Sequence, residues 1–155
     1  KGAVPLILTE RVEHVYDLQE KFTGFAKNII TLTGGMSKTE EATKMRLLEY
    51  IPDDAERLLI ATGKYIGEGF DYAPIDTLFI VMPISWKGTL QQYVGRLHRF
   101  HNKKEKVKVY DYVDENVTLL KAMFEKRLKT YHLMGYQIFG KEPIVQRKVE
   151  QLKLF

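Results

Sequence analysis

The sequence predicts an α/β fold: a three-layer, doubly wound and mostly parallel sheet with helices on both faces. Short, continuous apolar runs recur along the chain, as at 4–8, 58–62 and 76–82. Such runs are typical of parallel strands that are buried on both faces. The segments between them carry apolar residues at helical spacing. Alternation of strand and helix favours a parallel sheet with right-handed crossovers.

Each element has its own local signal. Strands are expected at 4–8, 27–33, 57–62, 76–82 and 106–113, and helices at 11–22, 38–50, 85–99 and 114–136, with a short helix or loop at 63–69. Thr9 is expected to cap the first helix. Ser37, followed by Glu40 three residues later, predicts a capping box at the start of the second.

Length and composition fit one soluble globular domain. The chain has 155 residues, 45% hydrophobic and 28% charged, with no cysteine. No apolar run reaches the roughly 18 residues of a membrane span, and the lack of cysteine fits a reducing, cytoplasmic setting. We expect one domain over 1–140 and a C-terminal extension over 141–155, either docked on the domain or leading to another. The net charge of +4 permits an anionic partner but does not require one.

The segment 85–99, SWKGTLQQYVGRLHR, carries the strongest functional pattern. At about 100° per residue, one side of a helix presents apolar residues, while Gln92, Arg96 and Arg99 fall on the opposite side. Two guanidinium groups at this spacing suit a polyphosphate. Gly95 costs a helix interior about 1 kcal/mol relative to alanine, which suggests close approach of a ligand to the backbone. A solvated amphipathic helix is the alternative interpretation.

Polar and glycine clusters follow four of the predicted strands. They occur at 9–11, 33–35, 62–63 and 83–87. Ligands of doubly wound folds collect at the carboxyl ends of parallel strands. Since glycine and threonine also end strands for purely structural reasons, each cluster alone is weak evidence, and the set of four is stronger.

Other candidate sites are excluded or weak. No Walker-type phosphate loop is present, because Gly35-Met36-Ser37-Lys38-Thr39 lacks the required glycines. The acidic stretch 53–56 precedes a strand and is assigned to a turn. No metal site is expected at His98 and His101, which lack further ligands at suitable spacing. The lysines within 103–108 are expected in a solvated loop rather than on nucleic acid, and the tyrosines of 110–136 in the core or at sheet edges.

Two stretches together resemble a known family. LLIATGKYIGEGFD at 58–71 and QQYVGRLHR at 91–99 are similar to motifs V and VI of superfamily 2 helicases and translocases. PLILTER resembles motif IV, and LTGGMSK resembles the motif IVa region. The resemblance covers about residues 4–115 and is nearest to DNA-repair and restriction-type DNA helicases. DEAD-box RNA helicases would show an arginine where this chain has Tyr93 and a glycine where it has His98.

The resemblance implies a RecA-like domain, the second of two that sandwich ATP in such motors. It implies catalytic roles for three residues of motif VI: Arg99 as the arginine finger, Arg96 as its partner and Gln92 near the γ-phosphate. Cofactor-binding residues would be Gly69 and Asp71 of motif V, with Gly95. Contacts to the nucleic-acid backbone would come from the motif IV and V segments, namely Arg11, Thr33, Gly34, Gly35, Thr62 and Gly63.

The function expected from this resemblance is that of the C-terminal motor domain of an ATP-dependent DNA helicase or translocase. ATP and Mg²⁺ would be bound mainly by an N-terminal RecA-like domain, and the partners would be that domain and DNA, with RNA less expected. This chain alone is expected not to hydrolyse ATP. The alternatives are a non-catalytic nucleic-acid-binding or docking module with this fold, and an unrelated doubly wound enzyme.

Overall fold

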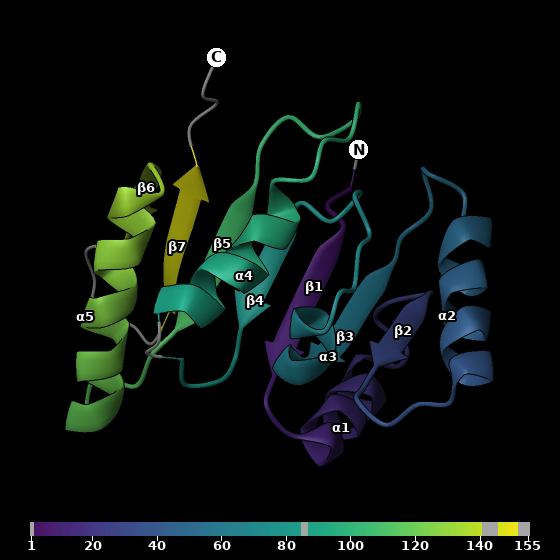
Figure 1. Cartoon of the computed structure of the whole chain (residues 1–155), viewed down its shortest axis with the longest axis horizontal. Coiled ribbons are helices and arrows are strands. Elements are labelled where there is room, and N and C mark those ends of the chain that lie inside the picture. Colours follow the sequence, from purple (N-terminus) through teal and green to yellow (C-terminus); the bar gives the residue numbers. More distant parts are fainter. Residues whose placement is uncertain (1, 85–86, 141–145, 152–155) are drawn as a thin grey trace.

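A mixed sheet with β1 (Pro5–Thr9) near its middle organises the molecule (Figure 1). The computed structural model describes residues 2–84 and 87–140, and the backbone of 146–151. Within that part, the strand order is β2-β3-β1-β4-β5-β7-β6. The parallel strands are β1, β2 (Ile29–Leu32), β3 (Leu58–Thr62), β4 (Thr77–Ile80) and β5 (Lys108–Tyr112). The predicted fold class is confirmed.

Helices connect these strands. They are α1 (Val12–Phe22), α2 (Lys38–Tyr50), α3 (Gly63–Gly67), α4 (Lys87–Leu97) and α5 (Thr118–Leu133). Side chains of α1 pack on one face of the sheet, against Ile7 and Ile60. The larger core lies on the other face, where residues of α2, α3, α4 and α5 join Leu6 and Leu8. The described helices therefore cover the two faces unequally.

Several local predictions hold. The Ser37 hydroxyl accepts a hydrogen bond of 3.1 Å from the backbone N–H of Glu40, as a capping residue should. The stretch 53–56 forms a turn, in which the N–H of Ala55 donates to the carbonyl of Pro52 over 2.9 Å. The first strand is shifted by one residue from its predicted position, and the other four predicted strands are longer than the observed strands by one or two residues at their ends.

Two local predictions are wrong. Thr9 does not cap α1: Arg11 occupies the N-cap position without a side-chain bond, and the Thr9 hydroxyl lies 2.6 Å from Nδ1 of His14. The last helix ends at Leu133 rather than near Tyr136. Gly135 follows with a φ of +81°, a conformation that ends helices and suits glycine. Tyr136 instead begins β6 (Tyr136–Phe139).

The C-terminal stretch contributes to the same sheet. β7 (Gln146–Gln151) pairs antiparallel with both β5 and β6, and lies between them. Part of the predicted extension is therefore a strand of the sheet of the domain. Trp86 lies outside the described residues. Among the residues that are described, no helix combines the length and apolar character needed to cross a bilayer.

Candidate nucleotide and nucleic-acid interface

Three threonines lie side by side at the carboxyl edge of the sheet. Thr9 is the register partner of Thr62, and Thr33 follows the β2 residue that is paired with Ala61. All three are at most 4% exposed. The Thr62 hydroxyl accepts a bond of 3.4 Å from the N–H of Tyr65 and caps α3. The Thr9 and Thr62 hydroxyl groups have partners within the protein, and the role of Thr33 and Thr62 in nucleic-acid binding stays a prediction.

Gly63, the next predicted contact residue, has a packing role that the sequence did not indicate. It is buried. A Cβ atom at this position would lie 2.7 Å from Cε of Met82 and closer still to the Tyr93 hydroxyl. Glycine is therefore required here because α4 packs closely against the start of α3.

Gly34 and Gly35 form the loop that follows β2. Gly35 is exposed and has a φ of +86°, which favours glycine. A Cβ atom on Gly34 would lie 3.8 Å from Cδ of Lys64, an exposed residue of α3. Lys64 was missed by the sequence reasoning, although it directly follows Thr62 and Gly63. Its amine adds a positive charge beside the exposed backbone of this loop.

A pocket of about 430 Å³ connects this loop to the segment after α3. Its lining includes Gly34, Gly35, Tyr65, Gly69 and Asp71. Gly69 has a φ of +107°, so a left-handed turn leads from α3 to Asp71. The pocket therefore lies between the predicted nucleic-acid-binding loop and the predicted cofactor-binding segment.

α4 packs with the face that its sequence predicted. Leu90, Val94 and Leu97 are buried, and Tyr93 joins them. Gln92 and Gly95 are exposed. A Cβ atom on Gly95 would have no neighbour within 4 Å, so no described side chain or backbone requires glycine there.

The sequence predicted that Arg96 and Arg99 would both lie on the exposed side of the helix, but their side chains are not equally exposed. Arg99 lies beyond the helix, which ends at Leu97, and its side chain is 54% exposed. Arg96 is half-buried, and its Nε atom is buried without a hydrogen-bond partner among the described residues. A buried donor without a partner is unusual and costly. Because this atom is covered by protein, it is not displayed on the exposed face of the helix.

Two direct contacts join the segments that resemble motifs V and VI. The Gln92 side chain donates from Nε2 to the carbonyl of Gly67 over 2.7 Å. The Nε of Arg99 lies 3.5 Å from Oδ1 of Asp71. These contacts involve three of the predicted catalytic and cofactor-binding residues, Gln92, Arg99 and Asp71, together with Gly67, which was not predicted. Arg11 lies apart at the start of α1, exposed and 3.4 Å from Glu13.

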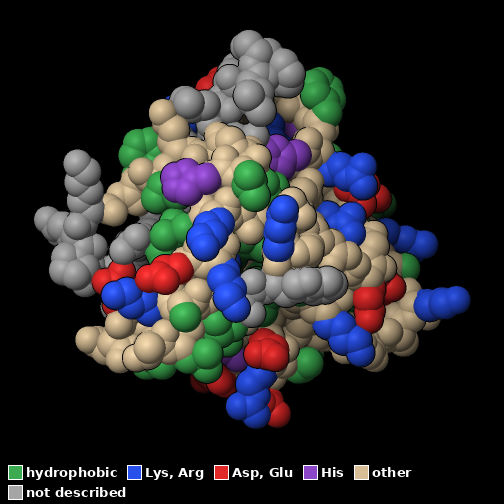
Figure 2. All heavy atoms as spheres, turned by 60° about the vertical axis from the view of Figure 1, so that its left-hand side comes forward, with side chains coloured by type: hydrophobic (Ala, Val, Ile, Leu, Met, Phe, Trp, Pro, Cys, Tyr) green, Lys and Arg blue, Asp and Glu red, His purple; other side chains and the backbone are tan. Residues whose placement is uncertain are grey.

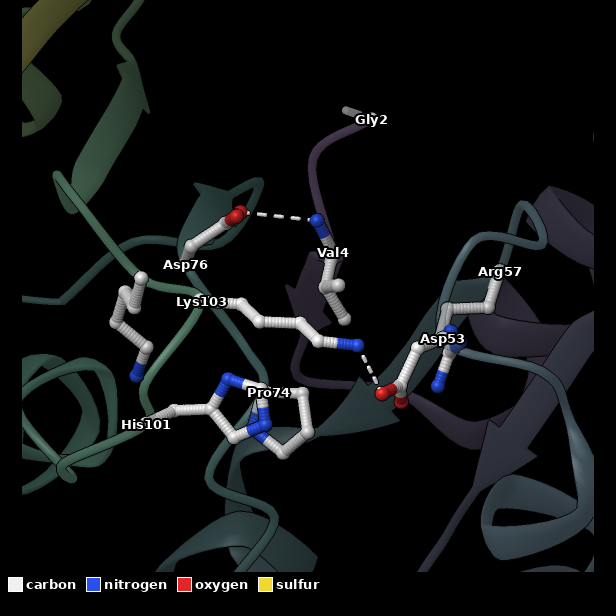
Figure 3. Close-up of a pocket in the computed structure, with 9 residues that line it drawn as sticks. Gly2, Val4, Asp53, Arg57, Pro74, Asp76, His101 and Lys103 are labelled. Carbon is white, nitrogen blue, oxygen red and sulfur yellow. Dashed lines mark hydrogen bonds and ion pairs between the residues drawn. The ribbon is translucent and has the colours of Figure 1, made fainter.

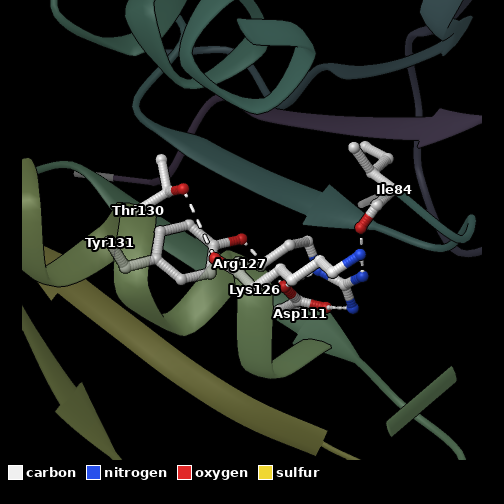
Figure 4. A network of polar contacts seen from close by, with 6 residues as sticks. All are labelled: Ile84, Asp111, Lys126, Arg127, Thr130 and Tyr131. Atoms are coloured by element: carbon white, nitrogen blue, oxygen red, sulfur yellow. Dashed lines mark hydrogen bonds and ion pairs between the residues drawn. The ribbon is translucent and has the colours of Figure 1, made fainter. Parts of the chain in front are cut away.

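A buried polar network around Asp111 reaches Ile84, in the segment between β4 and α4 (Figure 4). Arg127 of α5 donates to both carboxylate oxygens of Asp111 on β5, over 2.7 and 2.8 Å, and also to the carbonyl of Ile84. Tyr131 donates to Asp111 over 2.8 Å. Burial, with Asp111 adjacent, raises the pKa of Tyr131 well above its usual value. The network thus anchors the carbonyl of Ile84 in the segment that follows β4.

The loop after α4 is held at several points. The ring Nε2 of His98 lies 2.9 Å from the Tyr136 hydroxyl, and burial lowers the pKa of His98. Lys103 forms an ion pair with Asp53 across a small pocket at the amino end of the strands (Figure 3). Lys104 bonds to backbone carbonyl groups of the loop and of α4. Lys103 and Lys104 thus have partners within the protein, and are not simply solvated.

Basic side chains gather near the middle of the face shown in Figure 2. On α5 the exposed residues include Lys121, Lys126 and Lys129.

Within the described part of the chain, no three histidine or acidic side chains converge as metal ligands would.

The RecA-like α/β fold is similar to the folds of two solved C-terminal domains. The C-terminal part of the Fun30 ATPase domain is similar with a TM-score of 0.66 and 15% identity, over 79% of this chain and 38% of that chain. The C-terminal domain of the DEAD-box protein Dbp5 is similar with a TM-score of 0.63 and 18% identity, over 87% of this chain and 72% of that one. Identities this low show the fold alone, and the chain spans well under half of the Fun30 chain.

At the level of sequence, the chain belongs to the same family as Uncharacterized protein 108L of Invertebrate iridescent virus 3. The two are 30% identical over 104 residues, which are 67% of this chain and 95% of the viral protein. No family profile matches the chain.

Proposed function

We propose that this chain is the second RecA-like domain of an ATP-dependent DNA helicase or translocase. In this role it presents Arg99, Arg96 and Gln92 to a nucleotide that is held mainly by another domain. The observation that carries the proposal is the pair of contacts between α4 and the segment after α3, Gln92 to Gly67 and Arg99 to Asp71. They join the two segments that resemble motifs V and VI of the helicase family.

The residues present fit a triphosphate group. Among the described residues, the ion-pair partner of the Arg99 guanidinium is the exposed carboxylate of Asp71, which a phosphate oxygen could replace at little cost. The open space at Gly95 lets a ligand approach the backbone, and Arg96, which follows it, would have to turn its half-buried side chain outward to reach that ligand. ATP would supply the phosphoryl group that is transferred to water, with Mg²⁺ held by residues of the other domain. The arginines would stabilise the negative charge that spreads over the phosphoryl oxygens.

The DNA would contact the loop of Gly34 and Gly35. Backbone N–H groups of this exposed loop, together with the Lys64 amine, suit phosphate groups and read no base sequence. Because Thr33 and Thr62 are buried, we propose that the loop backbone rather than the hydroxyl groups makes the first contact. Opening and closing of the two domains around ATP would then move these contacts along the strand.

A docking module that binds no nucleotide is the second candidate. It is favoured by one observation: Gln92 and Arg99 already have partners within the chain. The two candidates differ in whether Arg99 affects turnover, and the following experiment separates them.

The test is Arg99→Ala in a protein that carries this chain together with a domain containing the Walker lysine. We expect DNA-stimulated ATP hydrolysis to fall about 100-fold or more, with KM for ATP changed much less, because the finger acts in the transition state. Arg46→Ala is the matched control, since Arg46 is an exposed arginine of α2 that lines no described pocket; its kcat should stay within about twofold. Equal turnover by the Arg99 variant and the wild type would remove the motor assignment.

A further inference from the structure

Arg99 depends on a loop rather than a helix for its position. Because α4 ends at Leu97, Arg99 lies two residues beyond the last helical residue, with His98 between them. A helix end leaves several carbonyl groups without intrahelical partners, and the backbone beyond it frays unless something binds these groups. The position of the Arg99 guanidinium therefore depends on the contacts that fix the backbone at Leu97 and Arg99.

Lys104 provides such a link. Its Nζ atom donates to the carbonyl of Leu97 over 2.8 Å and to the carbonyl of Arg99 over 2.9 Å. The loop turns back so that Lys104 reaches both groups, and its own N–H donates to the carbonyl of His101 over 3.0 Å. A lysine at this end of a helix is also favoured by the helix dipole.

The Lys104 amine contacts the backbone carbonyl of Arg99, whereas the Arg99 side chain contacts Asp71. Lys104 is half-buried, and burial lowers its pKa to about 8. The Arg99 side chain is 54% exposed and lies beside Asp71. Lys104 thus holds the backbone of Arg99 and leaves the guanidinium free to exchange Asp71 for a ligand.

We infer that Lys104 is a positioning residue for Arg99: it fixes the backbone from which the proposed arginine finger extends. This inference rests on the proposed function for its catalytic consequence, but the placement of Arg99 by Lys104 can be tested without any nucleotide. The alternative is that Lys104 only adds stability to the fold.

The chain offers a matched control next to the residue. Lys103 is adjacent in sequence, and its amine forms an ion pair with Asp53, in the turn that precedes β3. Lys104→Met keeps the length of the side chain and removes the donor, while Lys104→Arg restores a cationic donor. The comparison set is therefore Lys104→Met, Lys104→Arg and Lys103→Met.

The first measurement uses this chain alone. Proton–nitrogen NMR correlations of the Arg99 backbone amide and its Nε–H report on the position of Arg99, and thermal unfolding reports on the fold. We expect Lys104→Met to shift or broaden both Arg99 signals while signals of the β1 and β3 strands stay in place. Lys104→Arg should restore them, and Lys103→Met should leave them unchanged. Arg99 signals in folded Lys104→Met that coincide with those of the wild type would overturn the inference.

The second measurement is ATP hydrolysis in the protein that carries both domains. We expect Lys104→Met to lower kcat about tenfold, with KM for ATP within about threefold, because a displaced finger weakens mainly the transition state. If Arg99→Ala reduces turnover and Lys104→Met does not, the inference is wrong. If Arg99→Ala itself has no effect, the proposed function fails, while the NMR result still decides whether Lys104 places Arg99.

Discussion

Gly63 and Gly95 lie in neighbouring helices and have opposite surroundings. A Cβ atom on Gly63 would meet Met82 at 2.7 Å and the Tyr93 hydroxyl more closely, whereas one on Gly95 would meet nothing within 4 Å. We expect Gly63→Ala to destabilise the protein by about 1–3 kcal/mol through overpacking. Gly95→Ala should stabilise it by up to about 1 kcal/mol, since alanine is the better helix former. Urea unfolding of both variants checks this, and destabilisation by Gly95→Ala would show that this helix needs glycine for its own structure.

Tyr131 gives the protein a specific response to alkaline pH. Burial raises the pKa of its phenol well above 10.0, and the pKa values of Tyr65 and Tyr136 are raised for the same first reason. A group that holds its proton more tightly when folded stabilises the protein fully below its unfolded pKa, and this contribution is lost as pH rises through the folded pKa. We therefore expect the free energy of unfolding to fall more steeply above pH 10 in the wild type than in Tyr131→Phe.

The measurement is the urea midpoint of both proteins between pH 8 and pH 11. Tyr131→Phe should already be about 1 kcal/mol less stable at pH 8, because it loses the bond to Asp111. The comparison must be made at each pH, since Lys104 acts in the opposite direction. Its folded pKa of about 8 lies below the ordinary value for lysine, so its contribution to stability grows with pH. Parallel curves for the two proteins would contradict the role of Tyr131.

At the scale of elements, the contact between β5 and α5 depends on a buried ion pair. Asp111 is 0% exposed and Arg127 is 3% exposed. We expect Asp111→Ala to destabilise the protein by about 3–5 kcal/mol, because the Arg127 guanidinium would remain buried without its partner. Glu13→Gln, which removes one partner of an exposed pair with Arg11, should cost at most about 1 kcal/mol. Calorimetry or urea unfolding of the two variants would decide, and similar losses would mean that the buried pair is not what holds α5.

The elements also show what a sequence can and cannot predict. The apolar runs and the Ser37 cap predicted the parallel strands and α2, because these signals are local. The alternation in KVYDY places Asp111 on the same face as Val109, but its partner Arg127 lies 16 residues later on a different element. The sequence also favoured helix up to Tyr136, and it gave no strand signal for β7, whose pairing with β5 depends on long-range register.

In the candidate site, too, local patterns were predicted from the sequence and long-range contacts were not. Exposure of Gln92 and burial of Leu90 and Val94 follow from the period of α4, and were predicted. The burial of Thr33 and Thr62 was not, because a residue at a strand end becomes buried only through the helices that pack beside it. Contacts between segments, such as Lys104 with the Arg99 carbonyl, depend on loop geometry and could not be derived from spacing.

At the scale of the whole molecule, the proposed function gives the surface around α4 groups that would act on a nucleotide, but no phosphate-binding loop to hold it. The chain offers Arg99, Arg96 and Gln92, and its sequence contains no Walker phosphate loop. A guanidinium supplied from a second domain makes hydrolysis depend on the closure of that domain. If this chain supplies only the arginines and Gln92, ATP hydrolysis should depend on the partner domain that holds the nucleotide.

We accordingly expect the purified chain alone to release no inorganic phosphate from ATP above background, with or without single-stranded DNA. The physical reason is that two exposed side chains and a half-buried arginine, without a phosphate-binding loop, cannot orient the β- and γ-phosphates for attack by water. Phosphate release is measured under steady-state conditions at millimolar ATP and Mg²⁺, with the Arg99→Ala chain prepared in parallel as a check for contaminating hydrolases. Activity that is present in the wild-type chain and absent in Arg99→Ala would mean that this chain holds a complete site, and the division of labour between two domains would have to be abandoned.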